Sequence, residues 1–294
     1  MADSSIPTPL FHHIDGPYLK CEFLHPGRSH KARVAGALID DVEERGLIKP
    51  GSDRVLLERT GGNLGIALAI EARARGYALT LVTDPHYAAS KRILAAKLGA
   101  NVVDRTLAYP DATSNGQVID LLLLHDPARY VYLNQFGNPA NPRAHRDNTG
   151  AEICLQLRQR GLGDGVILVG GLGTGASMRG ITDALRPHFT VRTVAVEPAN
   201  CDLMSAVFRD HALQGIAVGE PAPFYPVTDL DDVVRVADAE AFDACNDLWS
   251  RNRLLVGPSS GANFAAARRL SQDSSHPRRP AVLTLLYDRG EDYL

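Results

Sequence analysis

The sequence has no long hydrophobic run and no excess of basic residues. Its apolar runs, such as residues 165–170, are far shorter than the roughly 20 residues that a membrane-spanning helix needs. Lys and Arg number 31 and Asp and Glu 34, which gives a net charge of −3 and argues against a broad basic face for nucleic acid. The N-terminal residues lack the basic and apolar segments of a secretory signal. We therefore expect no membrane association and no nucleic-acid partner.

Cysteine is also scarce. The four cysteines are scattered, with no CxxC pair and no metal-like spacing: Cys21, Cys154, Cys201 and Cys245. No pair among His30, His86 and His145 has metal-ligand spacing either. We expect reduced thiols, a cytoplasmic location and no bound metal.

Short β-rich runs alternate with longer helical patterns along the chain. Strands are predicted at 54–58, 78–84, 101–104, 130–134, 166–170, 191–197, 233–237 and 281–287. Helices are predicted at 34–44, 63–75, 88–98, 148–160, 176–185, 239–252 and 261–271. Gly76, Gly99 and Gly161 follow three of these helices, where a left-handed cap is favoured. Such alternation predicts an α/β fold of three-layer α/β/α type, with mostly parallel sheets and helices on both faces.

The length predicts two domains with a cleft between them. The stretch 137–143 holds two prolines that break both helical and strand patterns, so we place a domain junction there. We expect a smaller domain over residues 36–140. A larger domain is expected to combine residues 1–35 with 141–294.

A glycine-rich turn follows the apolar run at 166–170. Residues 170–180 read Gly-Gly-Leu-Gly-Thr-Gly-Ala-Ser-Met-Arg-Gly and lead into a helix, whose free N–H groups suit a phosphate. The run Gly171-x-Gly173-x-x-Ala176 also fits a dinucleotide fingerprint, with Glu197 ending the next strand where a ribose-binding acid would stand. A cup for a single phosphate monoester also fits, and tight packing of strand on helix is a third interpretation. The turn alone does not decide among these.

Three further segments carry candidate chemistry. Lys31 leads into a helix, where the dipole and loss of solvent lower an amine's pKa and suit a Schiff-base nucleophile; a solvated lysine is the alternative. Residues 58–65, Glu-Arg-Thr-Gly-Gly-Asn-Leu-Gly, connect a strand to a helix that begins at Asn63. The exposed N–H groups of this segment suit a substrate carboxylate; the alternative is that it is only a tight turn. Residues 256–262, Val-Gly-Pro-Ser-Ser-Gly-Ala, place a serine where it caps a helix or meets a ring nitrogen.

Together these segments resemble the cysteine synthase family, the fold-type-II pyridoxal-phosphate enzymes (tryptophan synthase β-like) that include O-acetylserine sulfhydrylase and cystathionine β-synthase. The resemblance covers nearly the whole chain. Besides the segments above it includes residues 8–10, 47–52, 134–142, 214–216 and 288–294. The resemblance implies pyridoxal 5'-phosphate as cofactor and a homodimer, with residues 1–35 and 141–294 anchoring the cofactor.

The resemblance also implies roles for individual residues. Lys31 matches the catalytic lysine that holds the cofactor, Asn63 the asparagine at the ring's 3-oxygen, and Ser259 the serine at the pyridine nitrogen. The phosphate cup corresponds to Gly173, Thr174, Gly175, Ala176 and Ser177. The residues that bind the substrate carboxylate in the family correspond to Thr60, Gly61, Gly62, Leu64 and Gln135. A dinucleotide interpretation leaves Lys31, Asn63 and Ser259 unexplained.

The implied activity is β-replacement on an O-activated L-serine through an aminoacrylate intermediate, with a small nucleophile adding to Cβ. The alternatives are a pyridoxal-phosphate-dependent β-eliminating lyase or dehydratase, and a nicotinamide-dinucleotide-binding α/β protein. One departure bears on the substrate: residues 60–64 read Thr-Gly-Gly-Asn-Leu, where sulfhydrylases typically have Thr-Ser-Gly-Asn-Thr. With a leucine at position 64, the loop resembles that of a branch of the family that makes diaminopropionate precursors. We therefore expect a transferase of specialised amino-acid biosynthesis.

Overall fold

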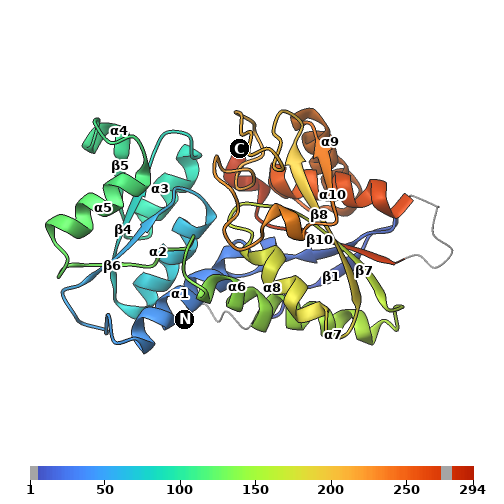
Figure 1. The fold of residues 1–294 in the computed structure, drawn as a ribbon, viewed down its shortest axis with the longest axis horizontal. Coiled ribbons are helices and arrows are strands. Elements are labelled where there is room, and N and C mark those ends of the chain that lie inside the picture. Colours follow the sequence, from blue (N-terminus) through green and yellow to red (C-terminus); the bar gives the residue numbers. More distant parts are fainter. Residues whose placement is uncertain (1–5, 273–279) are drawn as a thin grey trace. The chain divides into compact units, whose positions relative to one another are not determined.

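The computed structural model describes residues 6–272 and 280–294 (Figure 1). The described chain forms two compact units. The smaller comprises Pro26–Asn141 with Tyr293, and the larger comprises Ile6–His25, Pro142–Asp292 and Leu294. The boundary at Asn141 and Pro142 lies inside the proline-containing stretch 137–143. The sequence-based division assigns residues 26–35 to the larger domain. In the structure they group with the smaller unit, because the helix that starts at Lys31 continues to Glu44 without a break.

The smaller unit contains a parallel sheet in the order β5-β4-β3-β6. Its strands are β3 (Val55–Arg59), β4 (Ala78–Thr83), β5 (Asn101–Asp104) and β6 (Tyr130–Tyr132). Its helices are α1 (Lys31–Glu44), α2 (Asn63–Arg75), α3 (Ala89–Lys97), α4 (Arg105–Ala108) and α5 (Asn115–His125). One apolar cluster joins α1, α2 and α3 to one face of the sheet, and a second joins α5 to the other face. The unit therefore has three layers, with the carboxyl ends of its parallel strands at one edge.

The larger unit contains a mostly parallel sheet in the order β1-β2-β10-β7-β8-β9, in which only the β1–β2 pair is antiparallel among the described strands. Its strands are β1 (Leu10–His12), β2 (Tyr18–Cys21), β7 (Gly165–Gly171), β8 (Thr190–Pro198), β9 (Asp232–Val236) and β10 (Ala281–Leu286). Its helices are α6 (Ala140–Ala144, which begins in the smaller unit), α7 (Ala151–Gln159), α8 (Ala176–Leu185), α9 (Asp238–Asn252) and α10 (Pro258–Gln272). In Figure 1 the pair α9 and α10 covers one face of this sheet, and α7 and α8 cover the other. Short 3₁₀ or π-helical turns occupy Glu22–Leu24, His145–Gly150, Val227–Asp229 and Gly290–Tyr293.

The α/β class and the parallel sheets are confirmed, and the helices at 63–75 and 176–185 have the expected bounds. Gly76, Gly99 and Gly161 all have positive φ angles, as expected of left-handed caps. The strands β1 and β2 and the helix α5 were not expected. β1 and β2 are three or four residues long, too short for a periodic pattern, and α5 is apolar along most of its length.

Two expectations about individual residues were wrong. Pro142 does not break the helical pattern, because it lies in the first turn of α6, where the missing N–H has no intrahelical partner to lose. Trp249, whose place among apolar positions of the predicted helix 239–252 suggests a core residue, is instead 46% exposed and lies beside the Arg253 guanidinium.

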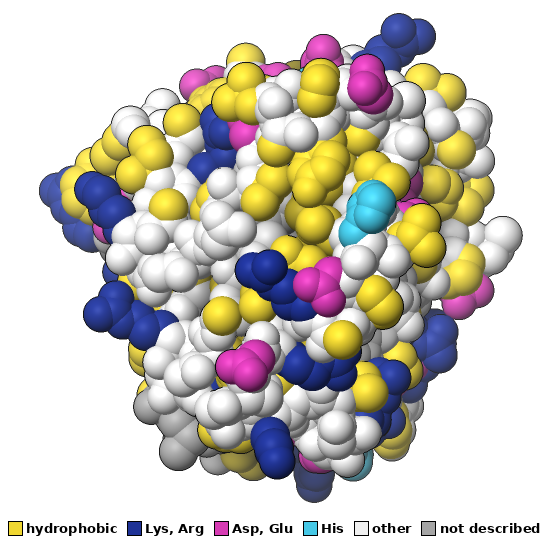
Figure 2. Space-filling view, turned by 90° about the vertical axis from the view of Figure 1, so that its left-hand side faces the viewer, with side chains coloured by type: hydrophobic (Ala, Val, Ile, Leu, Met, Phe, Trp, Pro, Cys, Tyr) yellow, Lys and Arg dark blue, Asp and Glu magenta, His cyan; other side chains and the backbone are white. Residues whose placement is uncertain are grey.

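All four cysteines lie in the described part of the chain and are unpaired. The described helices include none that is both long and apolar enough to cross a bilayer. On the face drawn in Figure 2, basic and acidic side chains are interspersed. That face therefore does not present one continuous field of either sign.

Candidate active site

Lys31 is the first residue of α1. Its backbone N–H donates to Ser29 Oγ at 3.3 Å, so the buried Ser29 supports the helix start. Although part of the residue is exposed, burial of the amine lowers the pKa of Lys31 from 10.5 to about 8, and the negative charge of Glu58 opposes this shift. An amine with such a pKa is a competent nucleophile near neutral pH. The amine thus has the property expected of a Schiff-base lysine.

Glu58, near the end of β3, is a residue to which the sequence analysis gave no role. Its carboxylate is fully buried and accepts backbone N–H groups from Arg59 at 2.9 Å and from Gln135 at 3.0 Å. Burial nevertheless raises the pKa of Glu58 from 4.5 to about 7. The available signal was a charged residue directly after the apolar run 55–57, but such a residue is equally common as a solvated strand end.

The asparagine loop, residues 60–64, connects β3 to α2. Asn63 is the first residue of α2, so the N–H groups of the loop and the first helical turn have no intrahelical acceptors. At Gly61 a Cβ would lie 2.6 Å from Cγ of Tyr87 and would also collide with the Thr83 hydroxyl. Tyr87 therefore packs where a larger residue of the loop would place its side chain.

Gln135 lies beside this loop. Its side-chain Nε2 donates to the backbone carbonyl of Arg59 at 3.0 Å, and its backbone carbonyl accepts from Asn141 Nδ2 at 2.8 Å. The preceding Asn134 adopts a positive φ of 56°, which turns the chain after β6. The smaller unit thus brings Lys31, Glu58, the asparagine loop and Gln135 into one neighbourhood.

In the larger unit the glycine turn connects β7 to α8 and is closely packed. Gly175 precedes α8 with a φ of 78°, and a Cβ there would lie 2.8 Å from the backbone N of Tyr225. A Cβ at Gly173 would lie 2.6 Å from the Gly215 carbonyl oxygen. Thr174 Oγ1 accepts the Ala176 N–H at 3.3 Å, so a hydroxyl stands at the helix start. Glycine is therefore required at these positions, and the turn presents the N-terminus of a ten-residue helix.

Buried polar side chains fix the base of this turn. Asn263 on α10 accepts the Gly171 N–H at 2.9 Å and donates to the Leu285 carbonyl at 3.0 Å. The Tyr287 hydroxyl lies 3.1 Å from the Gly171 carbonyl, and burial raises its pKa, which keeps it a neutral donor. The sequence analysis missed Asn263 and Tyr287, since neither belongs to the glycine motif.

Ser259 is buried and lies in the first turn of α10, one residue after Pro258. A capping role is therefore wrong for Ser259, because Pro258 already occupies the first helical position. The neighbouring Ser260 accepts the Tyr287 N–H at 2.8 Å and has a structural role.

Glu197, the acid required by the dinucleotide interpretation, is occupied by other contacts. It is buried, its Oε2 accepts the Leu203 N–H at 2.7 Å, and its Oε1 pairs with Arg235 Nε at 2.7 Å. A ribose would have to displace these partners. The geometry therefore gives no support to a nicotinamide dinucleotide at this strand end.

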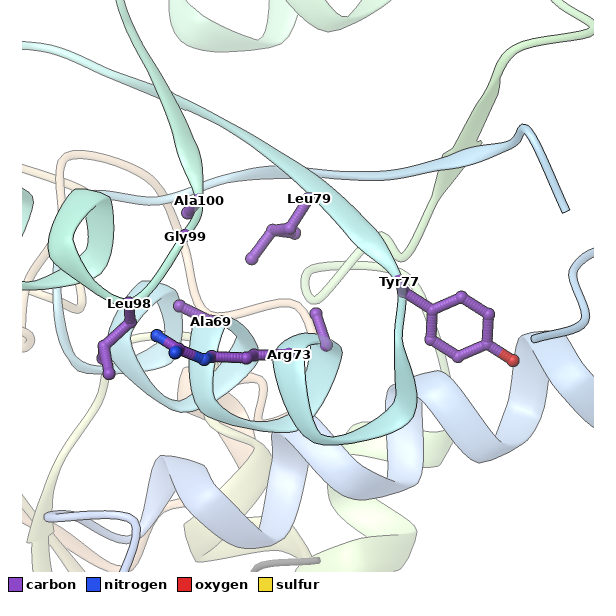
Figure 3. A pocket seen from close by; sticks show the side chains of 8 residues that line it. Ala69, Arg73, Tyr77, Leu79, Leu98, Gly99 and Ala100 are labelled. Atoms are coloured by element: carbon purple, nitrogen blue, oxygen red, sulfur yellow. The ribbon is translucent and has the colours of Figure 1, made fainter. Parts of the chain in front are cut away.

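A hollow of about 170 Å³ lies elsewhere in the smaller unit, between α2, β4 and the turn after α3 (Figure 3). Arg73 extends along it, whereas the Tyr77 ring points away. It is located at the amino ends of β4 and β5, opposite the edge that carries the asparagine loop, and the only hydroxyl among its described lining side chains, that of Tyr77, donates to Glu43. Within residues 6–272 and 280–294, no three His, Cys, Asp or Glu side chains are grouped to hold a metal ion.

The chain is similar to known proteins over most of its length. Residues 3–288 match the model of the family described as "Pyridoxal-phosphate dependent enzyme". Cysteine synthase A of Salmonella typhi is 35% identical over 285 residues, which cover 94% of this chain and 86% of that protein. O-ureido-L-serine synthase of Streptomyces lavendulae is 33% identical over 279 residues, covering 94% and 83%.

A similar solved structure agrees with these matches. The crystal structure of the O-acetylserine-dependent cystathionine β-synthase from Helicobacter pylori gives a TM-score of 0.88 at 30% identity, covering 100% of this chain and 96% of that one. This likeness and the family match cover both units. The chain therefore belongs to the family of pyridoxal-phosphate-dependent enzymes.

Proposed function

We propose that this enzyme catalyses β-replacement on an O-activated L-serine with a small nucleophile. The observation that carries the proposal is the buried amine of Lys31 near Glu58, which has its pKa lowered to about 8. The similarity to cysteine synthase A and to O-ureido-L-serine synthase supports the same reaction class.

The residues present fit pyridoxal 5'-phosphate. Capture of an aldehyde requires an appreciable fraction of neutral amine near physiological pH, which the lowered pKa of Lys31 provides. A phosphate monoester suits the glycine turn, where the absent Cβ atoms of Gly173 and Gly175 leave the backbone N–H groups accessible at the start of α8. We propose that Lys31, Asn63 and Ser259 hold the aldehyde carbon, the ring oxygen and the ring nitrogen. We assign the phosphate to residues 173–177.

The cofactor supplies an electron-withdrawing ring, and the protein supplies binding and proton transfer. We assign to the Lys31 amine the removal of the substrate's Cα proton, which its lowered pKa favours because the neutral amine is well populated near pH 8. Backbone N–H groups at residues 61–64 and the Gln135 amide bind the substrate carboxylate. Ser259 offers a hydroxyl to the ring nitrogen. A hydroxyl is not expected to keep that nitrogen protonated, which favours loss of a Cβ leaving group over transamination.

The asparagine loop also constrains the substrate. Gly61 and Leu64 supply no hydroxyl, so within this loop carboxylate binding depends on backbone donors and Thr60, with the Gln135 amide outside the loop. We propose a role in specialised amino-acid metabolism on this ground. A homodimer in the cytoplasm is the accompanying proposal, and sedimentation equilibrium of the purified chain tests the dimer.

Spectral titration tests the function. The purified protein should absorb in the visible, and borohydride should attach the cofactor to Lys31, as peptide mass spectrometry detects. Titration with L-serine, O-acetyl-L-serine and O-phospho-L-serine then identifies the leaving group by the spectral change that each produces. Product analysis with and without an added nucleophile separates β-replacement from β-elimination.

The matched variants are Lys31→Ala and Lys97→Ala, the second at an exposed lysine. Lys31→Ala should abolish turnover and borohydride attachment, while Lys97→Ala should retain both. Unchanged turnover in Lys31→Ala would refute the assignment.

A further inference from the structure

The buried carboxylate of Glu58 connects two segments that are distant in the sequence. Its Oε1 accepts the Arg59 N–H, which leads into the asparagine loop, and its Oε2 accepts the Gln135 N–H. A third hydrogen bond, from Gln135 Nε2 to the Arg59 carbonyl at 3.0 Å, spans 76 residues of sequence and closes the same junction. Both carboxylate oxygens are therefore used to hold together the two segments to which the substrate carboxylate is assigned.

We infer that Glu58 is a positioning residue of the active site, whose ionised carboxylate holds the asparagine loop and Gln135 in the fixed relation that substrate-carboxylate binding requires. The inference rests on the proposed function, because the substrate carboxylate is the common ligand of the two segments. It assigns Glu58 no contact with substrate or cofactor.

The two hydrogen bonds require a carboxylate rather than an amide. An ionised carboxylate accepts at both oxygens, whereas glutamine accepts at one and turns an NH₂ donor toward the other N–H. Glu58→Gln keeps the shape of the side chain but leaves one buried N–H facing a donor. A hydrogen bond to a charged group is worth a factor of roughly ten or more in an equilibrium constant. Because this one orders the segments that bind the substrate carboxylate, its loss should weaken substrate binding by a comparable factor.

Because the pKa of Glu58 is raised to about 7, its carboxylate is ionised in the alkaline range in which Lys31 titrates, and its charge there has a second, separately measurable effect. The charged and titratable groups that face it are Lys31 from α1, Arg59 from its own strand and Tyr132 from β6. Its negative charge raises the pKa of Lys31 against the effect of burial. Removal of that charge should therefore lower the pKa of the Lys31 amine, in a protein with or without cofactor.

The experiment compares Glu58→Gln, Glu58→Asp and the control Glu71→Gln, which changes a buried carboxylate of the same unit that pairs with Arg75. Steady-state kinetics gives KM and kcat for the amino-acid substrate of the loaded enzyme. Reductive methylation of cofactor-free protein with labelled formaldehyde gives the midpoint of Lys31 titration.

We expect Glu58→Gln to raise KM about tenfold or more, with a smaller change in kcat, and to lower the Lys31 midpoint. Glu58→Asp should raise KM while retaining the midpoint, because the shorter side chain keeps the charge but cannot reach both N–H groups. Glu71→Gln should change neither.

A Glu58→Gln enzyme with unchanged KM and unchanged Lys31 midpoint overturns the inference. If that variant does not fold, Glu58→Asp decides, and an unchanged KM there overturns it as well. Failure of the proposed function is distinct, since the wild-type protein would then form no β-replacement product with an added nucleophile, whatever residue occupies position 58.

Discussion

The lowered pKa of Lys31 leads to a quantitative prediction for the cofactor-free protein. Burial places the pKa of this amine at about 8 instead of 10.5. At pH 7.4 about 20% of the amine is then neutral, against about 0.1% for a solvated lysine, which is a gain of roughly 250-fold in the form that attacks an aldehyde. Because protonation removes the nucleophile, the rate of aldehyde capture should fall about tenfold per pH unit below this midpoint and level off above it.

Pulse labelling measures this midpoint directly. Cofactor-free protein is exposed briefly to labelled formaldehyde and cyanoborohydride between pH 6 and 11, and the peptides that contain Lys31 and the exposed Lys97 are quantified by mass spectrometry. We expect Lys31 to be labelled far faster than Lys97 at pH 7.4, with a rate profile centred about pH 8. A profile for Lys31 centred near 10.5 would refute the reasoning that burial controls this amine.

Two substitutions of glycine test the packing of the binding segments. Gly61→Ser, which introduces the residue typical of sulfhydrylases, should lower the free energy of unfolding by about 1–3 kcal/mol because the new Cβ meets Thr83 and Tyr87. Addition of Tyr87→Ala should recover part of the loss in chemical denaturation, and an undiminished stability of Gly61→Ser contradicts the crowding. Gly175→Ala should destabilise the protein by about 1–3 kcal/mol, because φ is 78° and the Cβ would meet Tyr225. It should also weaken cofactor binding in a fluorescence titration, and unchanged affinity would show that the turn tolerates a Cβ.

Much of the fold could be predicted from local pattern. The start of α2 at Asn63 and of α8 at Ala176 was predictable because each follows a glycine turn that ends an apolar strand. The short strands β1 and β2 were not, because each has only three or four residues and β2 joins the sheet by pairing with β10, which is far away in the chain. The start of α10 was expected three residues too late, because residues 258–260 were assigned to the preceding turn although proline suits the first helical position.

The order and type of most helices and strands and the glycine positions were determined by the sequence alone, because periodicity and backbone freedom are local properties. The identity of the candidate lysine also came from the sequence, through the order of motifs that resembles the cysteine synthase family. The protonation behaviour of that lysine and the role of Glu58 were decided only by the tertiary structure. Burial of an amine and hydrogen bonds to a carboxylate depend on groups brought together from distant positions, as with Gln135, which lies 77 residues from Glu58 along the chain. Desolvation and charge act through space, so no local pattern contains them.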